Sequence, residues 1–268
     1  MSRVRRPRRS GWRVLLYVYS ALVFAFLMLP LFIVFPISFS SASYLQFPPP
    51  GWSLRWYAAY VNDPVWLDAT FRSVKIAVCA TVLATLLGTL LAFSIVRGSY
   101  PGKELVNQIT AMPLIVPTII YSVAVYGLFG TLRLIGDWRG IVLGHTVHAI
   151  PYVVVIMIAA LRTFDFSLEQ AAMGLGASRM RAIWRVTLPQ IRPALISAVF
   201  LAFISSFDEL VIAMFLGGAN MTLPKKMFDN IVNAIDPTIA AVSVLQILVV
   251  SLALILSARF GAGARPAL

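Results

Sequence analysis

The sequence predicts an all-α membrane protein with six transmembrane helices, on the evidence of its composition and of the spacing of its apolar residues. Of the 268 residues, 60% are hydrophobic and only 12% are charged, and the mean hydropathy is +0.87. Soluble domains carry about 25% charged residues, so this composition excludes a soluble enzyme. Each long apolar stretch can cross about 30 Å of hydrocarbon as a helix, whereas a β-barrel would alternate in blocks of about ten residues.

The apolar stretches define the domain organisation. They cover roughly residues 14–39, 74–96, 106–129, 141–161, 194–216 and 239–258. A basic tail (1–13) precedes the first helix (14–39), and an external loop (40–73) follows it. Residues 74–260 form a core of five further helices with one long internal loop at 162–192, and residues 261–268 form a second tail. The first stretch is longer than the 7–15 apolar residues of a signal peptide, so we expect it to be retained.

The basic residues predict the orientation of the chain. The net charge is +12, which in a soluble protein would suggest nucleic-acid binding. Here the charges lie in short segments between apolar stretches. The segments on the same side of the membrane as the N-terminal tail carry most of the Lys and Arg, and the segments on the opposite side carry fewer. The positive-inside rule therefore places both termini and the loop at 162–192 in the cytoplasm. We expect a lipid bilayer, and no nucleic acid, around this chain.

The external loop (40–73) contains a cluster of aromatic residues after a proline-rich turn. The cluster consists of Trp52, Trp56, Tyr57, Tyr60 and Trp66. Aromatic side chains gather at membrane interfaces, so one interpretation is an interfacial belt with a short helix. The alternative is a docking surface for an external partner.

The internal loop at 162–192 is too long for a simple hairpin and predicts a protruding knob. Ser167 is expected to cap a helix that starts near Leu168, and Gly174 and Gly176 interrupt this helix. A second, amphipathic helix then follows, with apolar residues at Met180, Ile183 and Trp184. By composition alone, such a basic knob suits a partner protein or anionic lipid equally.

The same loop resembles the EAA loop of bacterial ABC-importer permeases, so we call residues 162–192 the EAA segment. The matching residues are Glu169, Gln170, Ala171, Ala172, Gly176, Leu188 and Pro189. The family pattern is E-A-A, three residues, G, nine residues, I-x-L-P. In this chain Gln170 stands at the first position with Glu169 before it, and Val186 replaces the isoleucine. The sequence leaves open whether Glu169 takes the role of the motif's carboxylate.

Further local matches point to the spermidine/putrescine permeases within this family. They are the segments 112–117 (MPLIVP), 148–152 (HAIPY), 206–209 (SFDE) and 222–224 (TLP). The resemblance covers about residues 70–260. It implies a type I importer permease fold in the inner membrane of a bacterial cell, and a small cationic solute. It also implies three partners: ATP-binding cassette ATPase subunits that receive a coupling helix, a second, homologous permease, and an external solute-binding protein.

ATP hydrolysis is not expected on this chain. A phosphate-binding P-loop requires a glycine-rich turn followed by Lys and Ser or Thr. The lysines are Lys75, Lys103, Lys225 and Lys226, and none of them lies in such a motif. We therefore expect no catalytic residue and no cofactor here, with energy supplied by a partner chain.

Two adjacent carboxyl residues, Asp208 and Glu209, lie in the fifth apolar stretch together with Ser205 and Ser206. An aspartate at the centre of a transmembrane helix costs about 2.5–3.5 kcal/mol on insertion scales, so these carboxyls are not expected to face lipid. One hypothesis is that the four residues line a pathway for a cation. The alternative is that the two carboxyls cap loop backbone or bond across helices.

Histidine, proline and glycine residues in the core raise further expectations. His145 and His148 lack a third ligand nearby, so we expect interfacial hydrogen bonds and no metal site. The prolines Pro113, Pro117 and Pro151 would kink their helices, either as hinges or to shape packing. Gly140 and Gly144 would let helices approach closely.

The sequence argues against two other classes of function. An ion-coupled secondary transporter that acts without an ATPase would show an internal repeat, and the sequence has no convincing one. It would also leave the EAA segment without a role. An intramembrane enzyme would require a catalytic motif such as HExxH or G-x-S-x-G, and the sequence contains neither.

Overall fold

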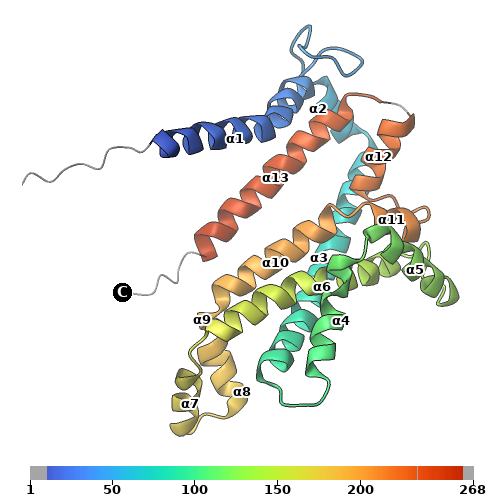
Figure 1. The fold of residues 1–268 in the computed structure, drawn as a ribbon. Coiled ribbons are helices and arrows are strands. Elements are labelled where there is room, and N and C mark those ends of the chain that lie inside the picture. The colour runs from blue at the N-terminus through green and yellow to red at the C-terminus, as the bar shows by residue number, and fades with distance from the viewer. Residues whose placement is uncertain (1–10, 234, 262–268) are drawn as a thin grey trace, which may run out of the picture. The chain divides into compact units, whose positions relative to one another are not determined.

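The computed structural model describes residues 11–233 and 235–261, and these residues form an all-α fold (Figure 1). The helices are α1 (Gly11–Ser38), α2 (Arg55–Asn62), α3 (Pro64–Arg97), α4 (Lys103–Ile115), α5 (Thr118–Thr131), α6 (Trp138–Thr163), α7 (Phe166–Gly174), α8 (Arg179–Ala182), the π-helix η1 (Ile183–Thr187), α9 (Leu188–Gln190), α10 (Arg192–Phe207), α11 (Val211–Leu216), α12 (Leu223–Asn233) and α13 (Thr238–Gly261). The predicted fold class is confirmed.

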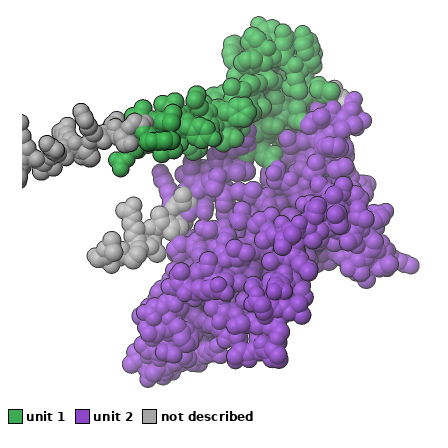
Figure 2. Space-filling view, viewed as in Figure 1, with its two compact units in different colours: residues 1–62, 234–246 green, residues 63–233, 247–268 purple. Residues whose placement is uncertain are grey.

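The chain divides into two compact units, coloured separately in Figure 2. The first comprises Met1–Asn62 with Ala234–Gln246, and it holds α1, α2 and the beginning of α13. The second comprises Asp63–Asn233 with Ile247–Leu268 and holds α3 to α12 and the rest of α13. The EAA segment and the carboxyl pair both belong to the second unit.

Within the described residues, four helices are long and apolar enough to cross a membrane: α1, α3, α6 and α13. Two bent helix pairs raise the number to as many as six. One pair is α4 with α5, at an angle of 110°, so the expectation of one helix over 106–129 is wrong. The break falls at Val116, which is extended because it precedes Pro117, and a residue before proline avoids the helical region.

Segment 40–73 is more ordered than a simple loop. It contains α2, and α3 already begins at Pro64, one residue after its N-cap Asp63. Trp56 is 8% exposed and donates from Nε1 to the carbonyl of Ala42, whereas Trp52 is 72% exposed. The aromatic cluster therefore divides into residues that hold this segment together and residues at its surface.

The core of the second unit lies between α3, α6 and α10. Its central cluster consists of Ala84, Ala92, Ala149, Val153, Met157, Leu161, Ile191, Ala198 and Ala202. Alanine dominates this list because small residues allow neighbouring helices to approach closely. Gly88 on α3 serves the same purpose, since a Cβ there would lie 2.8 Å from Cβ of Val153 on α6.

A second cluster packs α6 against α5 and α11. Gly144 lies at the closest approach, where an added Cβ would be 2.9 Å from Cδ1 of Leu216 and 3.0 Å from Cγ2 of Ile212. Both contact residues are fully buried. The expectation that Gly144 allows a close helix approach is therefore confirmed. Gly140 instead packs against the carbonyl of Leu134, in the turn before α6.

We expect Gly144→Val to destabilise the protein by about 1–3 kcal/mol, because the new side chain overpacks a filled core. Thermal unfolding of the detergent-purified chain measures this change. Gly127→Val on α5 is the matched control, since nothing lies within 4 Å of a Cβ at that position. Equal changes in the unfolding temperature of the two variants would show that the α6–α11 contact accommodates the larger side chain without loss of stability.

Candidate functional site

The EAA segment begins with α7, which Asp165 caps. Oδ1 of Asp165 accepts a hydrogen bond of 3.0 Å from the backbone N–H of Ser167. The expected cap at Ser167 is therefore wrong by two residues, since Ser167 lies in the first turn of α7. Hydrogen bonds from the side chain and backbone of Ser167 lower the pKa of Asp165. The cap is thus stable at neutral pH and is lost only when the pH falls through this lowered pKa.

The end of α7 explains the spacing of the motif. Gly176 has φ of +90°, a conformation that favours glycine. The N–H of Ala177 bonds to the carbonyl of Ala172, and the N–H of Gly176 bonds to the carbonyl of Met173. These two bonds make a Schellman motif, which ends a helix with glycine at its left-handed position. The four-residue step from Ala172 to Gly176 is the step that this motif requires.

The second half of the EAA segment is not the uniform α-helix that its periodicity predicts. It begins with α8, capped by Ser178, and continues as the π-helix η1 before α9. Pro189 has no N–H to offer to the carbonyl of Arg185, and its ring would clash with that carbonyl in an ideal α-helix. The wider π-turn just before Pro189 places Thr187 toward α7. Arg179–Gln190 meets α10 at an angle of 74°.

Glu169 is the buried residue of the motif. Its side chain is completely buried, and its two carboxylate oxygens lie 2.9 and 2.6 Å from Nη1 of Arg97, in the last turn of α3. Thr187 of η1 also donates to it, at 2.5 Å. Nothing in the sequence signalled Arg97 as a partner, because it lies 72 residues away.

The outward side of the EAA segment is apolar and basic. Gln170, Ala171 and Leu175 are exposed, and we call these three residues the coupling surface. Met180 and Trp184 are also exposed, but they line a cavity on the side toward α3. Leu175 is 90% exposed, which leaves a large apolar side chain available to a partner. Exposed arginines flank this surface at Arg179, Arg181 and Arg185. Of the remaining motif residues, Gly176 and Pro189 are exposed, and Ala172 and Leu188 are half-buried.

Asp208 and Glu209 lie at a helix break and not inside a continuous helix. α10 ends at Phe207 and α11 starts at Val211, so we call residues 208–210 the acidic break. Oε1 of Glu209 accepts from the N–H groups of Val211 and Ile212, at 2.8 and 3.1 Å. One carboxylate oxygen of Glu209 thus caps the start of α11. Asp208 is exposed.

The other oxygen of Glu209 faces α6. Oε2 lies 3.7 Å from Nε2 of His148, and the His148 ring contacts the rings of Tyr121 and Tyr152, with centroids 6.1 and 6.0 Å away. A carboxylate at the edge of such a cluster of rings is suited to an organic ammonium group, through charge and cation–π attraction. The sequence pointed to His148 and Glu209 separately but not to their proximity.

His145 and Ser206 are buried and bonded to each other. Nδ1 of His145 lies 2.8 Å from Oγ of Ser206, and the histidine is only 2% exposed. The expected hydrogen bonding of His145 is therefore confirmed, and this bond joins α6 to α10 inside the second unit. Ser205 is half-buried, so it and Asp208 are more accessible than Ser206.

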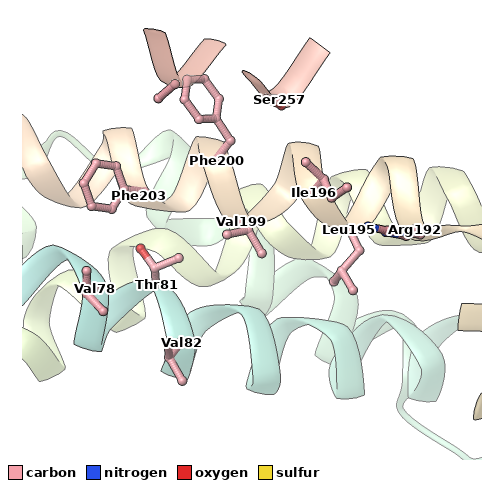
Figure 3. A pocket seen from close by; sticks show the side chains of 11 residues that line it. Val78, Thr81, Val82, Arg192, Leu195, Ile196, Val199, Phe200, Phe203 and Ser257 are labelled. Atoms are coloured by element: carbon pink, nitrogen blue, oxygen red, sulfur yellow. The ribbon is translucent and has the colours of Figure 1, made fainter. Parts of the chain in front are cut away.

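A groove of about 670 Å³ runs along α3 and α10 (Figure 3). Its lining includes Val78, Thr81, Val82, Ile196, Val199 and Phe203. The residues that line it include Arg192 and no carboxylate, so it does not suit a cation. The acidic break is the better candidate for contact with a cationic solute.

The chain is similar to known transport permeases over most of its length. The family described as "Binding-protein-dependent transport system inner membrane component" matches residues 9–264. The putrescine transport system permease protein PotI of Escherichia coli K12 is 36% identical over 245 residues, covering 88% of this chain and 86% of the relative. The spermidine/putrescine permease PotC of Haemophilus influenzae is 32% identical over 235 residues, covering 87% and 90%.

The fold has a counterpart among solved structures. A chain of a bacterial ABC transporter involved in the import of the acidic polysaccharide alginate superposes with a TM-score of 0.73. The two chains are 20% identical, and the match covers 95% of this chain and 99% of the other. The predicted permease fold is thus confirmed, and an ion-coupled secondary transporter is not favoured. The chain belongs to the family of inner-membrane components of binding-protein-dependent transport systems and is a permease subunit of an ABC importer.

Proposed function

We propose that this permease imports a small organic cation of the polyamine class. The observation that carries the proposal is the acidic break, where Glu209 lies beside His148, a residue in ring contact with Tyr121 and Tyr152, and where Asp208 is exposed. The relatives named as putrescine and spermidine permeases support it. A polyamine carries primary ammonium groups separated by methylene chains, and these match a carboxylate with aromatic neighbours.

Within the acidic break, we assign different tasks to the four residues that the sequence indicated. Asp208 and Ser205 are accessible and contact the solute directly. Glu209 contributes through Oε2, because its Oε1 is engaged by the backbone of α11. Ser206 has a supporting role, since its hydroxyl is bonded to His145.

The energy for import comes from other subunits in this proposal. The chain itself performs no catalysis and holds no cofactor, and an ATP-binding cassette subunit docks on the coupling surface in the cytoplasm. Both termini lie on the same side as this surface. A second permease, homologous to this one, completes the pathway, and a solute-binding protein delivers the cation from outside. ATP binding and hydrolysis then shift the populations of inward-open and outward-open states.

The breaks in the helices suit such a change of state. The α4–α5 break at Val116 and the acidic break both interrupt helices of the second unit without a long loop. A small change in backbone dihedrals at a break can redirect a whole helix, as at hinges in other transporters. We propose that Pro117 and residues 208–210 act as such hinges, while Pro151 lies inside the continuous helix α6.

The test is purification from the native membrane in a mild detergent, followed by reconstitution in liposomes. We expect an ATPase and a second permease to co-purify, and we expect import of labelled putrescine that requires ATP and the solute-binding protein. A chain that purifies alone and transports without ATP would contradict the proposal. ATP-dependent import of other solutes, with putrescine excluded, would contradict the polyamine assignment only.

A further inference from the structure

Arg97, Glu169 and Thr187 form a buried network that joins three elements of the second unit. Nη1 of Arg97 contacts both oxygens of Glu169, at 2.9 and 2.6 Å, and Thr187 donates to Oε2 of the same carboxylate. The Glu169 side chain is 0% exposed and that of Arg97 is 10% exposed. The network therefore connects the C-terminal end of α3 with α7 and with η1, away from water.

Aromatic rings surround the guanidinium group of Arg97. Its Cζ lies 5.0 Å from the ring centroid of Phe93, 5.8 Å from that of Phe164 and 5.1 Å from that of Phe166. These rings come from α3, from the residue after α6 and from the first residue of α7. Low polarity around the pair strengthens its attraction and penalises any separation of the two charges.

Elsewhere, a space separates α3 from the second half of the EAA segment. A cavity of about 1070 Å³ lies between them, lined by Thr89 and Leu90 on α3 and by Ile183 and Trp184 on η1. α7 itself packs against α8 and η1. The Arg97–Glu169–Thr187 network thus supplies a directional, hydrogen-bonded link between α3 and the EAA segment next to this space.

We propose that Arg97, Glu169 and Thr187 are positioning residues that make the EAA segment and the end of α3 move as one body. A displacement that an ATPase imposes on the coupling surface then reaches α3 and, through the shared core, α6 and α10. In this chain Glu169 accordingly faces inward, and the exposed Gln170 faces the partner. The inference rests on the proposed docking of an ATPase at the coupling surface.

A double replacement separates this role from simple stabilisation of the fold. Arg97→Met with Glu169→Met removes both charges and keeps apolar volume, a change that proteins often tolerate without loss of stability. In the reconstituted importer, we expect the amount of putrescine imported per ATP hydrolysed to fall about tenfold, the effect of losing a charge-assisted hydrogen bond. An unchanged ratio would mean that the network only supports folding, and the proposal would be wrong.

Thr187 offers a milder variant with a conservative rescue. Thr187→Val keeps the shape but removes the donor to Glu169, whereas Thr187→Ser keeps the donor. We expect the amount of putrescine imported per ATP hydrolysed to fall in the valine variant and to remain near the wild-type value in the serine variant. Thr163→Val is the control, since the Thr163 hydroxyl donates to carbonyls of its own helix, at Ala159 and Ala160. Equal ratios for Thr187→Val and Thr187→Ser would contradict the proposal.

A spectroscopic measurement tests the link independently of the solute. Spin labels at Ser167 on α7 and Leu90 on α3, both exposed positions, report the distance between the two elements. We expect a narrow distribution that ATP leaves unchanged in the otherwise wild-type complex, and a broad or shifted one in the double variant. If the wild-type protein fails to import putrescine, the proposed solute is wrong. The distance between the two labels still tests whether the Arg97–Glu169–Thr187 network holds α3 and α7 together. Identical distributions in both proteins would overturn it.

Discussion

Replacing Gly176 with aspartate is expected to abolish import while the chain still inserts into the membrane. Gly176 adopts φ of +90°, and a non-glycine residue in a left-handed conformation costs about 1–2 kcal/mol. The hydrogen bonds of the Schellman motif, to the carbonyls of Met173 and Ala172, would weaken, and the turn that contains Leu175 would change its conformation. Because this turn lies on the coupling surface, we expect the ATPase to be lost during purification. Co-purification and uptake by membrane vesicles measure the two effects.

Gly174→Asp is the matched control for this prediction. Both glycines have open space where a Cβ would be, so neither aspartate meets a steric clash within the chain. Gly174 lacks the positive φ of Gly176 and is the last residue of α7. We therefore expect Gly174→Asp to retain more ATPase and more import than Gly176→Asp. Equal activity in both variants would show that the geometry of the turn is not what the ATPase requires.

The EAA segment shows why some features were predictable from the sequence. Its glycines and apolar spacing are local signals, and a helix, a left-handed turn and a second helical stretch follow from them by short-range physics. The Schellman motif at Gly176 involves residues at most five positions apart. The sequence does not distinguish the cap at Asp165 from one at Ser167, because both residue types are good N-caps and only the path of the chain leaving α6 decides between them.

The contacts that the sequence could not predict depend on partners that are distant in the chain. The Arg97–Glu169 pair joins residues 72 positions apart, and His145 meets Ser206 across 61 positions. Hydropathy also could not distinguish a continuous span from a broken one, since both are apolar. The fifth stretch is one example, because the break at Asp208 and Glu209 has apolar helix on both sides.

Neutralising Asp208 is expected to weaken uptake of a polyamine by about tenfold or more, because a hydrogen bond to a charged group contributes about 1.5–3 kcal/mol. Asp208→Asn removes the charge at an exposed position of the acidic break and keeps the size of the side chain. The loss should appear mainly as a raised KM for labelled putrescine. Glu209→Gln should also raise the KM, because it removes the second charge of the acidic break. The amide oxygen of the glutamine can still accept the bonds from Val211 and Ile212, so the cap of α11 is kept.

Asp63→Asn is the control that separates a local effect from a change in overall charge. Asp63 caps α3 through a 2.8 Å bond from the N–H of Val65, and asparagine caps a helix equally well. This variant loses the same unit of charge as Asp208→Asn but lies outside the acidic break. If both variants reduce uptake equally and mildly, the acidic break is not on the path of the solute, and Glu209 serves only to cap α11. If Asp208→Asn alone raises the KM, its carboxylate contacts the cation during import.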